Sequence, residues 1–209
     1  MARREFRFPP VQLPEAAERL RSEVRAFIAE ELASGSFTPE CDSWLSGFSP
    51  EFSRKLGQRG WIGMTWPKTY GGHERTALER FVVTEELLAV GAPVAAHWIG
   101  DRQSGPLLLR FGTEEQRQRF LPQIVKGECY FGIGMSEPDS GSDLASIRTS
   151  ARREGDVWLL TGRKVWTSHA HRANFLIVLA RTAPATEERH AGMSQFLVPL
   201  DAPGVTVRG

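Results

Sequence analysis

A dense run of hydroxyl, carboxylate and glycine residues follows an apolar segment near the middle of the chain. The run is GMSEPDSGSDLAS (residues 134–146), and the CYFGIG that leads into it has the composition of a buried strand. A turn between strands needs only a few such residues, so the run is long enough to form a binding loop. Gly141 permits a positive φ, which would let neighbouring N–H groups face an anion or the polar edge of a ring. Three serines add rotatable hydroxyl groups: Ser136, Ser140 and Ser142.

The spacing of this run, taken alone, favours a simpler interpretation: an elaborate turn held by side-chain bonds to the backbone. A second segment shifts the balance. GRKVWTSHAHRANFLIVLAR (162–181) predicts a strand that carries Trp166, with Thr167 and Ser168 beside it. An aromatic face next to hydroxyl groups suits a planar heteroaromatic ligand, whereas the alternative for Trp166 is a place in the β-domain core. Two such segments from neighbouring strands together favour a planar cofactor.

Other binding and catalytic motifs are incomplete. Gly132 and Gly134 begin a G-x-G-x-x-G pattern, but Glu137 occupies the third position and Pro138 follows where a helix should start. This context excludes a Rossmann dinucleotide site. His-x-His at 169–171 would place both rings on one face of a strand, but a third ligand at suitable spacing is missing, so we expect no metal site. The sequence also lacks the G-x-S-x-G pattern of a nucleophile elbow.

Composition and charge are those of an ordinary globular protein. The 209 residues are 41% hydrophobic and 24% charged, with a net charge of +1. A net charge this small does not favour binding to nucleic acid or to an anionic membrane. No window of the sequence has the apolar length of a membrane span. The twin arginine at 3–4 lacks the apolar region of an export signal. Cys41 and Cys129 have no metal-ligand spacing, and we expect two buried, reduced thiols in a cytoplasmic protein.

Residues 1–127 predict an all-α domain. In EAAERLRSEVRAFIAEELA (15–33) the apolar residues recur at helical spacing and form one face. Gly105-Pro106 should divide 94–111 into two short helices, and Pro122 should kink or split the last helix. Three further helix starts carry capping signals: Ser49 with Pro50, Thr76 with Glu79, and Thr113 with Gln116.

Residues 128–209 predict a β-domain. Short β-branched or aromatic segments alternate with turn signals, and no helical pattern lies between them. This pattern indicates an antiparallel barrel or sandwich. A run of helices followed by a run of strands is typical of an α+β fold. The closing PGVTVRG (203–209) predicts a strand that has just begun, which leaves the sheet with an open edge. The segments expected to form strands are CYFGIGM, SIRTSARRE, VWLLTG, RKVWTS, NFLIVLAR, SQFLVPL and VTVRG.

Together these segments resemble the acyl-CoA dehydrogenase family. The family's middle domain carries a stretch resembling T-E-P-x-x-G-S-D, which here is SEPDSGSD (136–143). A later strand resembling K-x-W-I-T-N is here KVWTSH (164–169). Upstream, WPKTYGG (66–72) and RFGTEEQRQRFLPQIVKGE (110–128) resemble the family's N-terminal helical domain. Four motifs in the right order are far more specific than any one of them.

The resemblance implies that FAD binds against the β-domain. The first segment would bind the pyrimidine edge of the flavin, and the second would flank the ring and its N5 atom. The reaction implied is α,β-dehydrogenation of an acyl-CoA thioester, with hydride transfer to flavin N5. Ser142 would also contact the acyl-CoA substrate. The cofactor-binding residues implied are Ile133, Gly134, Met135, Ser136, Gly141, Ser142, Trp166, Thr167 and Ser168.

The resemblance also implies a C-terminal four-helix bundle that carries the general-base glutamate. We expect that bundle to be absent from this chain, which would then be the N-terminal portion of the enzyme and inactive by itself. No catalytic residue is assigned within it, because Glu85, Glu86 and Glu137 do not match the family's base. A homo-oligomer, dimer or tetramer, and an electron-transfer flavoprotein or similar acceptor are expected for the full-length protein.

Two alternatives stay open at this point. The chain could be a non-catalytic, base-lacking subunit or scaffold of a hetero-oligomeric dehydrogenase. It could also belong to an acyl-CoA oxidase or a flavin monooxygenase on the same fold, because oxygen reactivity depends on access around N5. The reaction products distinguish these cases.

Overall fold

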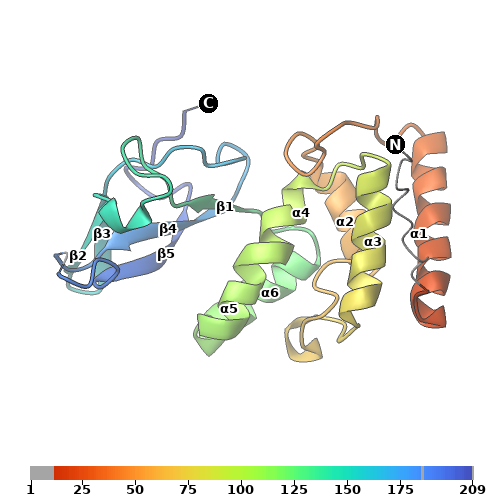
Figure 1. Cartoon of the computed structure of the whole chain (residues 1–209), viewed down its shortest axis with the longest axis horizontal. Helices are drawn as coiled ribbons and strands as arrows, with labels where there is room; N and C mark the ends of the chain where they lie inside the picture. The colour runs from red at the N-terminus through yellow and green to blue at the C-terminus, as the bar shows by residue number, and fades with distance from the viewer. Residues whose placement is uncertain (1–11, 185, 209) are drawn as a thin grey trace, which may run out of the picture.

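The structure is a computed structural model that describes residues 12–184 and 186–208. The helices occupy one side of the molecule and the sheet the other (Figure 1). The α+β arrangement expected from the sequence is thereby confirmed. The N-terminal arginine pair, for which we expected no export signal, and Gly209 of the expected last strand lie outside the described residues. Within the described ranges, no helix combines the length and hydropathy of a bilayer span.

Three helices of the helical half begin at the residues that the capping signals predicted. Ser49 accepts a hydrogen bond from the N–H of Phe52, and both predicted capping boxes form, at Thr76 and at Thr113. These bonds satisfy N–H groups that the first helical turn would leave unpaired. The helical elements are α1 (Glu15–Ala33), α2 (Pro50–Gln58), η1 (Lys68–Tyr70), α3 (Ala77–Ala89), α4 (Ala95–Ile99), η2 (Gly100–Ser104), α5 (Gly105–Phe111) and α6 (Glu114–Val125).

Two expectations about helix breaks need correction. Residues 95–111 form two short α-helices, as expected, but α4 passes into α5 through the π-helical turn η2 rather than a break. Pro106 lies in the first turn of α5, where its missing N–H is not needed. Pro122 does not split its helix, because α6 continues to Val125. Only one backbone bond is lost there, close to the end of the helix.

The β-domain contains a five-stranded sheet in which β4 is central. On one edge, β4 pairs in parallel with β1 and then with β2; on its other edge it pairs antiparallel with β5. β3 pairs antiparallel with β2. The strands are β1 (Phe131–Gly134), β2 (Ser150–Glu154), β3 (Val157–Thr161), β4 (Phe175–Arg181) and β5 (Met193–Pro199).

The expected antiparallel barrel is not confirmed, because this sheet is mixed and does not close within the described residues. The tight turn at 155–156 gives the antiparallel pair β2–β3, and the loop 182–192 gives the antiparallel pair β4–β5. The longer excursion from β1 to β4 returns the chain in the same direction, so these two strands are parallel. The segments 163–168 and 205–208 were expected to be strands and are not. The proposed domain division at 127/128 falls between α6 and β1 and stays a prediction.

An aromatic cluster joins the helices to the sheet. Phe120 of α6 packs edge-to-face on Phe175 of β4, with ring centroids 5.0 Å apart, and Phe131 of β1 stacks on Phe175 at 5.7 Å. Phe131 and Ile177 belong to the same buried cluster as the core of the helical domain. The start of β1 is therefore anchored against α6, and this fixes the strand that leads into the candidate binding loop.

A buried carboxylate joins α1 to α3. Glu86 accepts hydrogen bonds from Arg25 at 2.7 and 3.0 Å and also from Arg21. Hydrogen bonds from Arg25, opposed by desolvation and reinforced by Arg21, hold the pKa of this carboxyl below its ordinary value. A depressed folded-state pKa stabilises the fold above the unfolded pKa, and the stabilisation is lost as pH falls through the folded pKa.

We therefore expect Glu86→Gln to lower the free energy of unfolding by about 1 kcal/mol at pH 7. The difference from wild type should shrink as the pH is lowered below the ordinary glutamate value of 4.5. Urea denaturation at pH 7 and at decreasing pH measures both effects. Glu23→Gln, an exposed position on α1 between Arg21 and Arg25, is the control. A loss in Glu86→Gln that is the same at every pH would contradict this assignment.

Candidate functional site

The structure brings the two segments singled out in the sequence side by side. The N–H of Val165 donates to the carbonyl of Ser136 at 2.9 Å, and Lys164 Nζ donates to the carbonyl of Met135 at 2.9 Å. A methyl group placed on Gly132 would lie 3.5 Å from Thr167 and from Ser168. The second segment therefore runs along β1 and the start of the loop that follows it.

The loop after β1 is organised around Glu137. This buried carboxylate accepts the backbone N–H of Arg148 at 2.7 Å and that of Thr149 at 2.9 Å, and Lys164 Nζ lies 2.9 Å away. Burial would raise the pKa of the carboxyl, but hydrogen bonds from Thr149, the backbone of Arg148 and Lys164 lower it to about 2. Glu137 therefore stays ionised at any working pH and holds both ends of the loop together.

Bonds within the loop give it a compact turn. Glu137 and Ser140 exchange two backbone hydrogen bonds, at 2.7 and 3.1 Å, and the hydroxyl of Ser140 donates to the carbonyl of Asp143. Asp143 also pairs with Arg189 at 2.8 Å, which ties the loop to the connection between β4 and β5. The turn that the residue spacing favoured is thus present, and Ser140 is used inside it.

Gly141 and Ser142 lie exposed at the tip of this loop. Gly141 permits a positive φ, but it does not adopt one in this structure. A side chain at this position would meet no atom within 4 Å. The glycine is therefore not required by the fold here, and the space around it is open to a ligand.

Trp166 differs from both sequence expectations. It does not lie on a strand, because the chain from Gly162 to Asn174 is irregular, and it is not a core residue, because it is 90% exposed. Its φ is +57°, a left-handed conformation that a bulky residue rarely adopts. Strained backbone conformations cluster at functional sites, so this exposed aromatic residue is a candidate for ligand binding. Thr167 beside it is half-buried, and Ser168 is exposed.

The predicted cofactor residues on β1 and its end occupy a partly shielded surface. Gly134 is buried, whereas the other three are half-buried: Ile133, Met135 and Ser136. Sequence reasoning missed the structural importance of Glu137 and Lys164, although both are part of the two motifs. The signal available was the opposite charge of the two segments, because the first carries acidic residues and the second carries basic ones.

The histidines at 169 and 171 belong to a turn, so the premise that they share one face of a strand is wrong. The ring of His169 packs against Phe48 at 5.1 Å, and desolvation lowers the pKa of His169. Across the described ranges, no group of three His, Cys, Asp or Glu residues gathers in a way that could hold a metal ion. His169 instead connects the Trp166 segment to the helical half of the molecule.

The two cysteines lie in different environments. Cys129 is buried, and this desolvation raises the pKa of its thiol to about 12, so it is inert. Cys41 is exposed, which corrects the expectation that both thiols are buried. Neither cysteine is disulfide-bonded.

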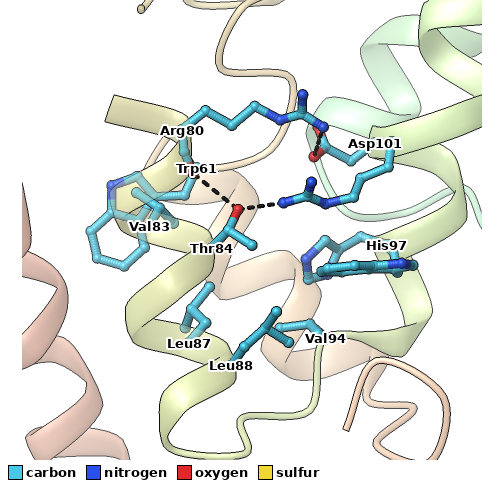
Figure 2. A pocket seen from close by; sticks show the side chains of 11 residues that line it. Trp61, Arg80, Val83, Thr84, Leu87, Leu88, Val94, His97 and Asp101 are labelled. Atoms are coloured by element: carbon cyan, nitrogen blue, oxygen red, sulfur yellow. Dashed lines mark hydrogen bonds and ion pairs between the residues drawn. The ribbon is translucent and has the colours of Figure 1, made fainter. Parts of the chain in front are cut away.

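A small cavity lies between α3 and the α4–η2 run (Figure 2), and its lining includes no residue of the loop after β1. Its wall includes buried Asp101, which accepts the N–H of Gly63 at 2.7 Å and pairs with Arg80 at 3.6 Å. Arg102 donates to Thr84 at 2.5 Å and lies 4.3 Å from the centre of the Trp98 ring. The cavity volume of about 20 Å³ accommodates a water molecule and excludes a flavin ring.

Comparison with known proteins identifies the two halves separately. The family described as "Acyl-CoA dehydrogenase, N-terminal domain" matches residues 14–128, and "Acyl-CoA dehydrogenase, middle domain" matches residues 132–209. The acyl-CoA dehydrogenase IpdE1 of Mycobacterium tuberculosis is 40% identical over 200 residues, covering 91% of this chain and 51% of that protein. FadE26 of the same organism is 36% identical, covering 90% of this chain and 48% of the relative. The chain thus spans about half the length of these curated relatives.

Solved structures with a similar fold belong to the same family. The Tcur3481-Tcur3483 steroid ACAD has a TM-score of 0.82 at 36% identity, covering 92% of this chain and 50% of that one. The ChsE4-ChsE5 complex from Mycobacterium tuberculosis has a TM-score of 0.80 at 36% identity, covering 94% and 49%. A glutaryl-CoA dehydrogenase from Mycobacterium smegmatis in complex with FADH2 has a TM-score of 0.72 at 28% identity, covering 92% and 47%. The chain belongs to the acyl-CoA dehydrogenase family.

Proposed function

We propose that this chain supplies the FAD-binding portion of an acyl-CoA dehydrogenase. The observation that carries the proposal is Trp166, a strained and exposed residue in the segment that runs along β1. A loop rich in hydroxyl groups next to an exposed aromatic ring suits a flat cofactor, because the hydroxyl groups can bind its polar edge and the ring can cover its face. A relative in the family has been solved with FADH2.

The residues present fit FAD. The polar edge of the ring would be held by backbone and hydroxyl groups of the first segment, where Gly141 leaves open space. The face of the ring would be covered from the second segment, where Trp166 stands free of neighbouring core residues. The bound flavin would supply the two-electron acceptor for α,β-dehydrogenation of an acyl-CoA thioester. The proposed cofactor-binding residues are Ile133, Gly134, Met135, Ser136, Gly141, Ser142, Trp166, Thr167 and Ser168.

The substrate part of the proposal is an acyl-CoA thioester, with Ser142 at the tip of the loop as a contact residue. The relatives include a steroid ACAD and a glutaryl-CoA dehydrogenase, so the family accepts acyl groups of different kinds. An electron-transfer flavoprotein as acceptor, a homo-oligomeric state and a cytoplasmic location are further parts of the proposal, and they rest on the sequence analysis.

The carboxylates of the loop are poorly suited to remove the α-proton of a substrate. Glu137 is saturated by three donors, and its pKa is about 2, far below that of an efficient base near neutral pH. Asp143 is paired with Arg189, and hydrogen bonds from Ser146 and Arg189 lower its pKa. Asp139, the third carboxylate of the loop, is 75% exposed and lies 3.5 Å from Arg148, so it too is paired with a cation. We therefore propose that the general base does not come from this loop.

A second candidate function is a base-lacking subunit of a hetero-oligomeric dehydrogenase. The observation in its favour is the similarity to the ChsE4-ChsE5 complex. An acyl-CoA oxidase or flavin monooxygenase would differ in product. Enoyl-CoA formed with an added electron acceptor supports a dehydrogenase, whereas peroxide or a hydroxylated product supports the other two.

The test of the proposed function is an FAD titration of the purified 209-residue chain, followed by flavin fluorescence. We expect weak, saturable binding and no turnover with acyl-CoA and an artificial acceptor, because the described loop contributes no base. Absence of saturable binding would overturn the FAD proposal. Robust turnover by this chain alone would overturn the expectation that the base lies elsewhere.

A further inference from the structure

A buried ion pair lies beneath the two segments of the candidate site. The side chains of Glu137 and Lys164 are 7% and 9% exposed, and Lys164 Nζ lies 2.9 Å from Glu137 Oε1. Neither residue is among the groups proposed to touch the flavin. An ion pair so deeply shielded loses the hydration of both charges, which makes it a costly feature to keep for stability alone.

The contacts of this pair connect the two segments of the site and the two ends of the loop. Glu137 binds the backbone of Arg148 and Thr149, and this closes the loop at its far end. Lys164 donates both to Glu137 and to the carbonyl of Met135, so it attaches the second segment to the start of the loop. One residue further along in each segment, the N–H of Val165 donates to the carbonyl of Ser136, which joins the same two segments again.

The next residue after Val165 is the strained Trp166. A left-handed conformation at a bulky residue persists only where the surrounding bonds determine the backbone on both sides. On the N-terminal side, those bonds are the ones made by Lys164 and Val165. On the C-terminal side, the N–H of Ala170 donates to the carbonyl of Thr167 at 3.2 Å. The ion pair is thus part of what determines the direction in which the Trp166 ring points.

We propose that Glu137 and Lys164 are positioning residues that hold the two cofactor-binding segments in register. The inference rests on the proposed FAD site and adds two residues that do not themselves contact the cofactor. The pair acts as a unit. Glu137 neutralises the buried ammonium group, and Lys164 places the second segment at a fixed distance from the loop. Removing either partner leaves the other charge buried and unpaired.

The experiment compares Glu137→Gln, Lys164→Met and the double variant with the wild-type 209-residue chain. Each protein is examined by urea denaturation, by FAD titration and by visible circular dichroism of the bound FAD. We expect each single variant to bind FAD at least about tenfold more weakly and to change the dichroism, because charge-assisted hydrogen bonds that orient the segments are lost. Glu154→Gln removes a partner from the exposed Arg152–Glu154 pair on β2 and is expected to bind like wild type.

The double variant separates positioning from stability. It contains no unpaired buried charge, so we expect its urea midpoint to recover toward wild type while its FAD affinity stays low and its dichroism stays altered. Recovery of affinity together with stability would show that the pair acts only through folding, and the proposal would be overturned. Wild-type affinity and dichroism in the single variants would overturn it as well. Failure of the wild-type chain to bind FAD would instead contradict the proposed function.

Discussion

Replacing Trp166 with alanine is expected to weaken FAD binding about 30-fold, which corresponds to about 2 kcal/mol. The free energy of unfolding should stay within about 0.5 kcal/mol of wild type, since the ring is 90% exposed and supports no core. The substitution removes the one large apolar surface that the second segment offers. FAD titration by fluorescence and urea denaturation of the same preparation measure the two quantities.

The matched control is Trp158→Ala. Trp158 is a tryptophan in the same domain, 43% exposed on β3, and it packs against Phe196 of β5 with ring centroids 5.3 Å apart. Because it lies outside the two cofactor-binding segments, its loss should leave FAD affinity unchanged. Equal affinity in Trp166→Ala and wild type would remove Trp166 from the site. Equal losses in both tryptophan variants would point to an effect on the whole domain.

Replacing Phe131 with alanine is expected to destabilise the protein by about 3–5 kcal/mol. Phe131 is 2% exposed at the start of β1 and packs between Phe120 of α6 and Phe175 of β4, at 5.9 and 5.7 Å. The truncation leaves a cavity where helices and sheet meet, and rigid elements on both sides limit its collapse. A loss of this size is a large fraction of the roughly 5–15 kcal/mol that typically stabilises a folded protein.

Urea denaturation of Phe131→Ala against wild type measures this loss. Phe111→Ala provides the control, because the Phe111 side chain is 69% exposed at the end of α5. The control should unfold within about 0.5 kcal/mol of wild type. A loss below about 1 kcal/mol in Phe131→Ala would mean that α6 and the sheet are not joined through this cluster. The start of β1 would then have no rigid anchor.

Features encoded over a few neighbouring residues could be predicted from the sequence. The helix starts at Ser49, Thr76 and Thr113 follow from side chains that bind N–H groups three residues further along. The change from helical to extended structure follows from the change in apolar spacing and in β-branched content. The motifs around residues 136–143 and 164–169 led to the family, which the comparisons confirm.

The same local reasoning failed where an outcome depends on distant parts of the chain. Pairing of β1 with β4 in parallel depends on how the long connection between them returns, which no short pattern specifies. The residues around Trp166 have the composition of a strand, yet Trp166 has a left-handed φ, and Lys164 and Val165 before it are hydrogen-bonded to the preceding loop. Glycine at position 141 could adopt a positive φ, but the fold does not require one there.

Local patterns were sufficient to predict three capped helix starts, the order of helical and β structure, and the two chemically rich segments. The folded chain was needed to show that these segments lie together, that the Trp166 ring is exposed to solvent, and that Glu137 and Lys164 are joined beneath them. This division follows from the range of the interactions. Caps and helical faces are set by hydrogen bonds and burial within a turn or two, whereas strand order and a buried ion pair exist only after the whole chain has folded.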